Sequence, residues 1–369
     1  MTFPGRLFRR PFCCRSGRLP QPAPRGKSDG TPAASSRKVP SPLSPSASSF
    51  LTSAPADLAR AAELLRQGAC VALPTETVYG LAADATNPAA LAQVFAIKGR
   101  PLLDPLIVHV LDQAALAEVA EPDARLAKLA HLWPGPLTVV LRRKSVVPDL
   151  VTAGKDTVAV RIPAHPIFRE VLRLSGRPLA APSANPFGYV SPTKAAHVRD
   201  SLGERCPWIV DGGACAHGVE STILDLSFPG RARLLRPGPI PLEVLRDLLG
   251  EVEVVTRAAS QQAAQDAPGM LERHYSPATR VALFPHGTLP VIANLRSAIL
   301  FMGRRSSPPG NADVFLLSES GSTEEAARNL FDLLRQLDGR GYETIHAELA
   351  PPAGIGAAYN DRLTRASAR

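Results

Sequence analysis

The chain of 369 residues has no apolar run close to the roughly 18 residues that are needed to cross a membrane. Its longest apolar runs, such as 106–111, have the length of a β-strand. Hydrophobic residues make up 45% and charged residues 20% of the chain, which is the balance of an ordinary globular protein. We therefore expect a soluble protein with no membrane partner, and the length favours two domains.

Cysteine is scarce, and the five cysteines form no CxxC pair and no zinc-binding spacing. This pattern predicts buried thiols in a reducing compartment, a cytoplasmic location and no metal held by protein ligands alone. The sequence also contains no Walker loop, no GxGxxG after a strand and no nucleophile elbow. An ATP site in this chain must therefore be of an uncommon type.

Positive charge is concentrated at the N-terminus. The net charge is +9, but residues 1–50 hold nine basic residues and one acidic residue, so the remaining chain carries only about +1. This distribution argues against a globally basic RNA-binding surface outside the first residues. A local phosphate pocket stays open.

Composition divides the chain into four segments. Residues 1–52 are rich in Pro, Ser and Arg without hydrophobic periodicity, and we expect a disordered tail. A start codon further downstream or a targeting peptide are alternatives, although the prolines disfavour the amphipathic helix of a transit peptide. Residues 53–250 form a predicted α/β sheet domain, 251–277 a linker, and 278–369 a smaller α/β domain.

Strand and helix patterns alternate in both predicted domains. Strands are expected at 69–73, 106–111, 137–141, 157–162, 179–182, 208–210 and 221–226, and in the second domain at 280–284, 298–302 and 313–317. Helices are expected at 57–67 with Asp57 as N-cap, 88–98 with Asn87 as N-cap, 113–132, 166–174, 193–202, 241–249 and 323–337. This alternation predicts an α/β fold with a mixed sheet.

Two pairs of residues could bind anions or polar ligands. Lys98 and Arg100 end a predicted helix, where a lysine point charge beside an arginine fork can hold a polyphosphate, although cations at helix ends are common without function. Ser183 and Asn185 offer hydrogen bonds at a spacing of two, which places them on one face of a strand, or they belong to a turn. These patterns alone predict an anion-binding α/β enzyme.

Arg161 lies within a predicted strand and is flanked by Val158, Val160 and Ile162. An arginine buried among apolar residues needs an anion. A ligand carboxylate would fit its fork, and an internal Asp or Glu would serve as well. The segment 74–80, PTETVYG, places hydroxyl groups directly after a strand, where open α/β sheets bind ligands, or it is a capped turn.

In combination these segments resemble the threonylcarbamoyl-AMP synthase family, whose catalytic unit is the YrdC-like domain. The matching motifs occur in the family's order and are PTETVYGLAADA, FAIKGRP, DPLIVHV, WPGPLT, VTAGKDTVAVRIPAHP, AAPSANPFGYVSPT, VDGG, GVESTILDL, LLRPGPI, APGMLERHYSP and GIGAAYNDRLTRAS. The resemblance covers about residues 55–369. It implies a YrdC-like twisted mixed sheet with flanking helices, followed by a smaller Rossmann-like α/β domain.

The resemblance also implies a reaction. A nucleotidyltransferase of this family joins L-threonine, bicarbonate and ATP into threonylcarbamoyl-AMP and pyrophosphate, with Mg²⁺ accompanying the ATP. A tRNA threonylcarbamoyl transferase complex then uses the product to modify an adenosine next to the anticodon, and weak binding of tRNA or other RNA is expected. No covalent enzyme nucleophile is needed, so catalysis would consist of positioning and charge stabilisation.

Individual roles follow from the same resemblance. It implies that the catalytic residues are Lys98, Arg100, Ser183 and Asn185. ATP contacts are implied for Arg100, Asp104, Thr157, Ser183, Ser191 and Arg236. L-threonine contacts are implied for Thr77, His109, Arg161, Ala181 and Ser221, with Arg161 on the carboxylate, and no residue is assigned to a metal.

The chain departs from the family pattern at two places. Asp104 stands where many relatives have Asn, and a carboxylate near phosphates needs Mg²⁺ or Arg100 to screen it. In the linker, Leu271 and Glu272 replace part of the PGMKYKHY sequence that relatives often have, which predicts altered contacts. A non-catalytic RNA-binding module is the main alternative function. A carbamoyl-transfer enzyme of hydrogenase maturation is disfavoured, because that protein carries cysteine-rich zinc fingers.

Overall fold

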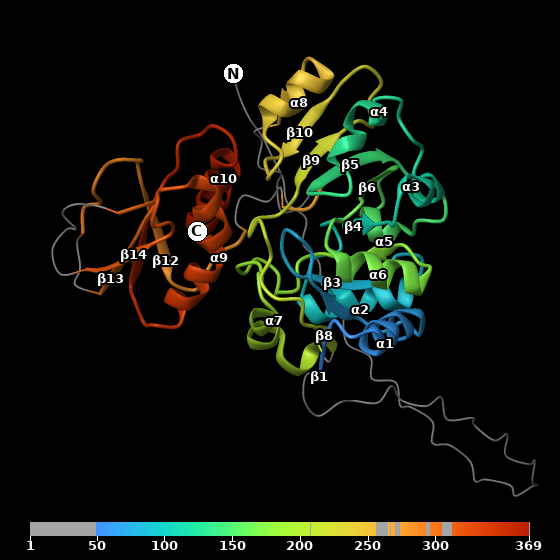
Figure 1. Cartoon of the computed structure of the whole chain (residues 1–369), viewed down its shortest axis with the longest axis horizontal. Coiled ribbons are helices and arrows are strands. Elements are labelled where there is room, and N and C mark those ends of the chain that lie inside the picture. The colour runs from blue at the N-terminus through green and yellow to red at the C-terminus, as the bar shows by residue number, and fades with distance from the viewer. Residues whose placement is uncertain are drawn as a thin grey trace, which may run out of the picture. The chain divides into compact units, whose positions relative to one another are not determined.

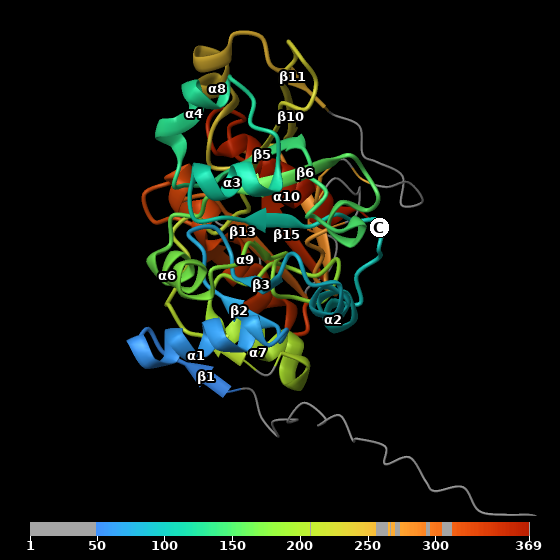
Figure 2. The ribbon, with the colours of Figure 1, turned by 90° about the vertical axis from the view of Figure 1, so that its right-hand side faces the viewer.

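The computed structural model describes residues 49–206, 208–255, 265, 267–269, 274–292, 296–304 and 312–368. Predictions for the chain before residue 49, and for Leu271 and Glu272 of the linker, lie outside these residues. The described strands form one sheet of eleven strands and one of four, with helices packed against both (Figures 1 and 2). The predicted α/β fold with a mixed sheet is confirmed.

The large sheet has the strand order β1-β8-β2-β3-β7-β4-β6-β5-β9-β10-β11. Its strands are β1 (Ser49–Leu51), β2 (Val71–Leu73), β3 (Gly80–Asp84), β4 (Ile107–His109), β5 (Leu137–Arg142), β6 (Thr157–Arg161), β7 (Leu179–Ala180), β8 (Trp208–Val210), β9 (Thr222–Asp225), β10 (Arg233–Arg236) and β11 (Glu253–Val254). The accompanying helices are α1 (Pro55–Arg66), α2 (Pro88–Lys98), α3 (Gln113–Val119), α4 (Leu126–Leu129), α5 (Asp149–Thr152), α6 (Pro166–Ser175), α7 (Ala195–Leu202) and α8 (Leu242–Leu249), with 3-10 turns η1 (Ala130–Leu132) and η2 (Gly203–Arg205).

Helices cover both faces of the sheet around β2 and β3, because these strands are apolar on both sides. Val71 and Leu73 of β2 belong to the core that contains residues of α1 and α6. Ala72 belongs to a different core, together with residues of α2 and α7. Side chains alternate along a strand, so a continuous apolar run needs a helical layer on each face.

The two faces differ around β4, β6 and β5. Val108, Val160 and Val139 point into the main core, which also contains residues of α2, α3, α4 and α8. On the opposite face the register places His109 of β4 beside Arg161 of β6, and Arg161 beside Thr138 of β5. Polar side chains from three neighbouring strands thus meet on one face, where a binding site can form.

The small sheet is entirely parallel, with the order β12-β15-β13-β14. Its elements are β12 (Arg280–Phe284), β13 (Ser297–Phe301), β14 (Asp313–Leu316), α9 (Thr323–Asp338), β15 (Thr344–Glu348) and α10 (Gly356–Ser367). Its core contains Leu330 and Phe331 of α9 and Tyr359 of α10. The predicted smaller α/β domain is therefore present among the described residues.

Several predicted elements are wrong in detail. A single helix over 113–132 is not formed, because Pro122 separates α3 from α4: proline lacks an N–H group and disfavours helix in the residue before it. Asp57 is not an N-cap, since α1 begins at Pro55 and the Asp57 carboxylate accepts hydrogen bonds from the N–H and hydroxyl of Thr52. The predicted α2 with Asn87 as N-cap is confirmed.

Predicted boundaries also change at both ends of the large sheet. Residues 49–51, which fall in the predicted disordered tail, form β1 and pair with β8. At the other end β11, at 253–254 in the predicted linker, pairs with β10. Neither short strand has an alternating pattern strong enough to be read from the sequence. The predictions missed β3, β10, β15 and α10 as well.

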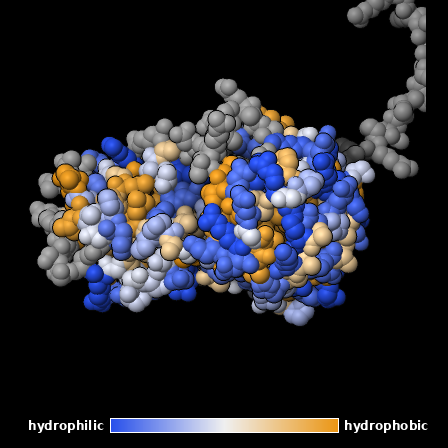
Figure 3. Space-filling model, turned by 90° about the horizontal axis from the view of Figure 1, so that it is seen from above, coloured by the Kyte–Doolittle hydropathy of each residue, from blue (hydrophilic) through white to orange (hydrophobic). Residues whose placement is uncertain are grey.

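The surface shown in Figure 3 is mainly hydrophilic, with hydrophobic residues in small patches. Exposed large hydrophobic side chains include Leu102, Leu289 and Val291. Among the described residues, no helix is both long and apolar enough to cross a membrane.

Candidate active site

A small cavity lies on the polar face of the large sheet. Eight of the residues predicted for the site line it, namely Thr77, Arg100, His109, Arg161, Ala181, Ser183, Ser221 and Arg236. Five do not, namely Lys98, Asp104, Thr157, Asn185 and Ser191. The cavity has a volume of about 50 Å³.

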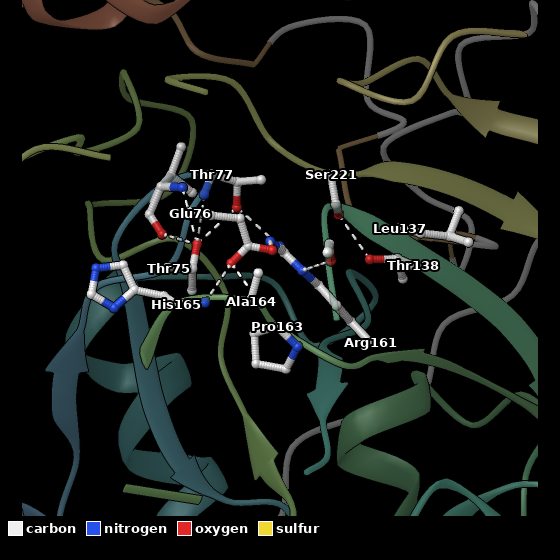
Figure 4. Close-up of polar contacts among 12 residues, drawn as sticks. Thr75, Glu76, Thr77, Leu137, Thr138, Arg161, Pro163, Ala164, His165 and Ser221 are labelled. Atoms are coloured by element: carbon white, nitrogen blue, oxygen red, sulfur yellow. Dashed lines mark hydrogen bonds and ion pairs between the residues drawn. The ribbon is translucent and has the colours of Figure 1, made fainter. Parts of the chain in front are cut away.

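Arg161 is the buried cation at the centre of this site (Figure 4). It donates from Nη2 to Glu76 Oε1 at 2.7 Å, from Nη1 to the Thr77 hydroxyl at 2.9 Å and from Nε to the Gly135 carbonyl at 3.3 Å. Of the two anions predicted for Arg161, a ligand carboxylate or an internal Asp or Glu, the internal one is present as Glu76. A guanidinium has five N–H groups, and the described residues accept hydrogen bonds from three of them, which leaves one on each Nη for a ligand carboxylate.

Glu76 is a functional candidate that the sequence interpretation did not single out. Its carboxylate is buried and accepts hydrogen bonds from Arg161, from Ala164 N at 3.1 Å and from His165 N at 3.3 Å (Figure 4). The burial of Arg161 was the signal for such an acid. Since Glu76 lies 85 residues away in the chain, spacing could not identify it.

The Glu76 carboxylate is expected to stabilise the fold in a pH-dependent way. Burial works against ionisation, but Arg161 and the backbone N–H groups outweigh it and lower the pKa of Glu76 from 4.5 to about 2. A lowered pKa adds stability above the ordinary value, and this stability is lost as the pH falls from 4.5 through about 2. The contribution is about 3 kcal/mol.

Urea unfolding of the wild type and Glu76→Gln from pH 7 to pH 3 measures this contribution. The difference in free energy of unfolding should stay constant down to about pH 5 and shrink below it. A difference that is independent of pH down to pH 3 would contradict the pairing.

His109 supplies a neutral imidazole to the cavity. It is buried, its ring centroid lies 4.9 Å from that of Phe168, and Nδ1 has no hydrogen-bond partner among the described residues. Burial, and secondly the charge of Arg161, lowers the pKa of His109 to about 3. The ring is therefore uncharged at neutral pH and can exchange hydrogen bonds with a polar ligand without adding charge.

Ser221 connects the sheet to Arg236. Its hydroxyl lies 2.8 Å from that of Thr138 and accepts a hydrogen bond from Arg236 Nη2 at 3.1 Å. Arg236 also donates from Nε to the Ser221 carbonyl at 3.1 Å and from Nη1 to the Pro268 carbonyl at 3.2 Å. The cation of Arg236 is thus held at a defined position in the cavity wall.

Gly238 allows this arrangement because it has no side chain. A Cβ atom at Gly238 would clash with the backbone N of Thr222 and lie 2.5 Å from the carbonyl carbon of Ser221. Gly238→Ala is therefore expected to lower the free energy of unfolding by about 3 kcal/mol and to displace Ser221. The matched control is Gly339→Ala, where no atom lies within 4 Å and a change below about 0.5 kcal/mol is expected. Equal effects of the two changes on urea unfolding would contradict this packing.

Lys98 and Arg100 are both buried, and each contacts neighbouring backbone. Lys98 Nζ donates to the carbonyls of Ser183 at 2.6 Å and Asn185 at 2.5 Å, while Arg100 donates from Nη2 to the Pro105 carbonyl at 2.7 Å. Burial and the nearby Arg100 charge lower the pKa of Lys98 well below its ordinary value. The two cations are close to each other, as predicted, but only Arg100 lines the cavity.

Asp104 is screened by Arg100. The Arg100 guanidinium lies 2.9 Å from Asp104 Oδ1, and both side chains are buried. Mg²⁺ and Arg100 are the two cations predicted from the sequence to screen this carboxylate, and the structure contains the pair with Arg100.

The Ser183–Asn185 segment lies in a loop. β7 ends at Ala180, so of the two alternatives for this pair the turn after a strand holds and the shared strand face does not. Pro182 and Pro186 interrupt the pattern of backbone hydrogen bonds that a longer strand would need. Ser183 lines the cavity, whereas Asn185 donates its side-chain amide to the carbonyls of Pro186 and Tyr189.

The remaining predicted ATP contacts lie outside the cavity wall. Thr157 is four residues from Arg161 on the same strand, so both side chains are on one face but at opposite ends of β6. The hydroxyl of the buried Ser191 donates to Glu220 Oε1. Glu220, in turn, lines the cavity.

Residues of the predicted linker contribute to the cavity wall. They are Pro268, Gly269, His274 and Tyr275. Tyr275 has a positive φ of 60°, which is uncommon for a residue with a side chain. One contact of this segment with the sheet is the hydrogen bond from Arg236 of β10 to the Pro268 carbonyl, which joins residues 32 positions apart.

No group of three or more His, Cys, Asp or Glu residues is arranged to hold a metal in the described part of the chain. Three buried acidic residues in or beside the cavity wall are each paired with an arginine: Glu76 with Arg161, Asp104 with Arg100, and Glu220 with Arg362. The site therefore provides cations for an anionic ligand and no ready set of metal ligands.

Comparisons with known proteins give consistent matches. The chain is 41% identical to threonylcarbamoyl-AMP synthase of Pyrococcus abyssi over 83% of this chain and 93% of the relative, and 39% identical to that of Bacillus subtilis over 84% and 92%. The crystal structure of P. abyssi Sua5 complexed with L-threonine superposes with a TM-score of 0.79 at 38% identity, covering 87% of this chain and 98% of that chain.

The fold is that of an α/β enzyme, and its cavity is lined by three buried arginines, Arg100, Arg161 and Arg236. Residues 63–238 match the family described as "Telomere recombination", and residues 240–368 match the "Threonylcarbamoyl-AMP synthase, C-terminal domain". The chain belongs to the threonylcarbamoyl-AMP synthase family. It is an ATP-using enzyme of the AMP-forming nucleotidyltransferase type, and the resemblance found in the sequence is confirmed.

Proposed function

We propose that this chain joins L-threonine, bicarbonate and ATP into L-threonylcarbamoyl-AMP and releases pyrophosphate. Family membership and the similarity to a structure that contains L-threonine support this reaction. The observation that carries it is Arg161, a buried guanidinium with an N–H group on each Nη still available in the cavity. A zwitterionic amino acid that places its carboxylate there gains two charge-assisted hydrogen bonds.

The substrates react in two steps. The threonine ammonium first loses a proton to solvent. The uncharged nitrogen then forms a bond to the carbon of bicarbonate, and a hydroxide equivalent leaves with a second proton from the nitrogen as water. An oxygen of the resulting carbamate then attacks the α-phosphorus of ATP, and the bond to the bridging oxygen breaks as pyrophosphate leaves. Neither step needs a covalent bond to the enzyme, so the protein contributes orientation and fixed charges.

Threonine would lie at the end of the cavity formed by β4 and β6. Arg161 holds its carboxylate, and Thr77, His109, Ala181 and Ser221 surround its amine and side chain. His109 is neutral at physiological pH, so it can accept a hydrogen bond from the amine. The small Ala181 leaves room for the substrate beside the sheet.

ATP would lie across the same face of the sheet. Arg100 and Arg236 contact its phosphates, and Lys98 holds the loop of Ser183 and Asn185 against them. Thr157, Ser191 and Asp104 complete the nucleotide site. Mg²⁺ would be held by phosphate oxygens, since nearby carboxylates are engaged by arginines, and it would neutralise charge on the triphosphate.

The product is the donor for N6-threonylcarbamoyladenosine next to the tRNA anticodon. A tRNA threonylcarbamoyl transferase complex consumes it in the cytoplasm, with weak binding of tRNA by this chain. We further propose that residues 53–250 are the catalytic domain, with 278–369 as a second domain behind the linker 251–277.

Pyrophosphate release tests the proposed reaction. The full chain is incubated with ATP, bicarbonate and Mg²⁺, and with L-threonine, L-serine or no amino acid. Release is expected with L-threonine and at a much lower rate in the other two mixtures. If folded protein releases no pyrophosphate with L-threonine, the proposed reaction is wrong, and a non-catalytic RNA-binding module is favoured.

A further inference from the structure

Arg362 of α10 is a fully buried arginine that reaches the wall of the active site. It donates from Nε to Glu220 Oε2 at 2.6 Å and from Nη2 to the Pro237 carbonyl at 3.1 Å. Nη2 also donates to the Glu220 carbonyl at 3.4 Å, and Nη1 donates to Asp361 Oδ2 at 2.6 Å. The guanidinium carbon also lies 5.1 Å from the ring centre of Tyr275, which lines the cavity.

The loop that carries Glu220 is packed into the core of the small sheet. Val219 is fully buried and belongs to the same core as Phe331 and Tyr359. A Cβ atom at Gly218 would clash with the backbone of Arg328 in α9, so this glycine permits the close approach. Gly218 and Val219, which precede Glu220 and Ser221, therefore fix this loop through their contacts with α9 and α10.

Glu220 and Pro237 are each next to a residue that we place in the active site. Glu220 precedes Ser221 and also accepts a hydrogen bond from Ser191. Pro237 follows Arg236, which itself donates to Ser221. One guanidinium therefore holds two chain segments together, and these segments carry the residues proposed to contact L-threonine and ATP.

We propose that Arg362 is a positioning residue for the active site, through which the C-terminal domain completes the site for L-threonine and ATP. The inference rests on the proposed function. Removal of the guanidinium leaves Glu220 buried without its cation and releases the Pro237 carbonyl. Both changes let Ser221 and Arg236 move, and small displacements of such groups weaken binding and slow the reaction.

The test compares Arg362→Met with the wild type. KM for L-threonine is expected to rise by about tenfold or more, with a similar rise in the dissociation constant of ATP measured by calorimetry. Arg362→Lys should lie between them, because an ammonium group can pair with Glu220 but cannot reach Pro237 as a fork does. A loss of folded molecules would lower kcat and leave KM unchanged, so KM distinguishes positioning from folding.

Two further variants distinguish a positioning role of Arg362 from a general loss of stability. Glu220→Gln/Arg362→Met removes both buried charges, and we expect it to regain thermal stability while KM stays high. Asp332→Asn weakens the contacts of α9 with Lys194 and His197, neither of which lines the cavity, and it should keep the wild-type KM. ATP binding needs no turnover, so this measurement still tests Arg362 if the wild type proves inactive.

An unchanged KM and an unchanged ATP dissociation constant in Arg362→Met would overturn the proposal. The same holds if Asp332→Asn raises KM as much as Arg362→Met does, because the effect would then come from any weakened contact of the C-terminal elements. Recovery of normal KM in the double variant would likewise contradict it.

Discussion

Lys98→Met is expected to lower the rate of threonine-dependent pyrophosphate release by about 10³-fold. The Nζ group of Lys98 donates hydrogen bonds to the carbonyls of Ser183 and Asn185. Burial and the Arg100 charge lower its pKa, and the phosphates of bound ATP would favour the charged form again. A methionine fills a similar volume but offers neither hydrogen bonds nor charge. The loop would lose its anchor, and the negative charge of the leaving pyrophosphate would lose part of its stabilisation.

The control is Lys128→Met, which changes an exposed lysine on α4 and should leave the rate unchanged. Circular dichroism and thermal unfolding of each variant establish how much protein is folded. If folded Lys98→Met releases pyrophosphate within about tenfold of the wild-type rate, Lys98 has no part in catalysis.

Arg161→Gln is expected to lower kcat/KM for L-threonine by about 10²–10³-fold. The two N–H groups that we assign to the substrate carboxylate would be absent, and a neutral amide cannot replace a bidentate charged contact. ATP lies on the neighbouring part of the site, so its dissociation constant should change by no more than about twofold. Steady-state kinetics with L-threonine and calorimetry with ATP measure the two effects separately.

The single variant leaves Glu76 buried without its cation, which destabilises the fold. Glu76→Gln/Arg161→Gln removes both charges, and it should regain stability without regaining activity. Arg173→Gln, on the exposed side of α6, is the matched control and should behave as the wild type. Recovery of activity in the double variant would show that Arg161 serves the fold only.

The parts of the site that are local in sequence were predictable. The KGR motif, the Ser183–Asn185 pair and Arg161 each have a chemical signature within a few residues, and all lie in or next to the cavity. Burial of Arg161 could be inferred from its apolar neighbours on the strand. The alternation of strands and helices was sufficient to predict the α/β class.

The partners of these residues could not be predicted, because they come from distant segments. Glu76 meets Arg161 across 85 positions, and Glu220 meets Arg362 across 142. No periodicity relates such pairs, since the fold alone brings them together. Short strands such as β1 and β11 could not be predicted for a related reason. Each forms by pairing with a strand of the sheet, β8 or β10, and its own few residues do not specify a strand.

The origin of the carbon in the product tests the proposed reaction most directly. The full chain would be incubated with ATP, L-threonine and ¹³C-bicarbonate, and the product analysed at once by mass spectrometry. The expected result is threonylcarbamoyl-AMP with the label in its carbamoyl group, none when L-threonine is omitted, and far less when Arg161→Gln is used. Pyrophosphate release without a labelled adduct of threonine and AMP would contradict the proposed function.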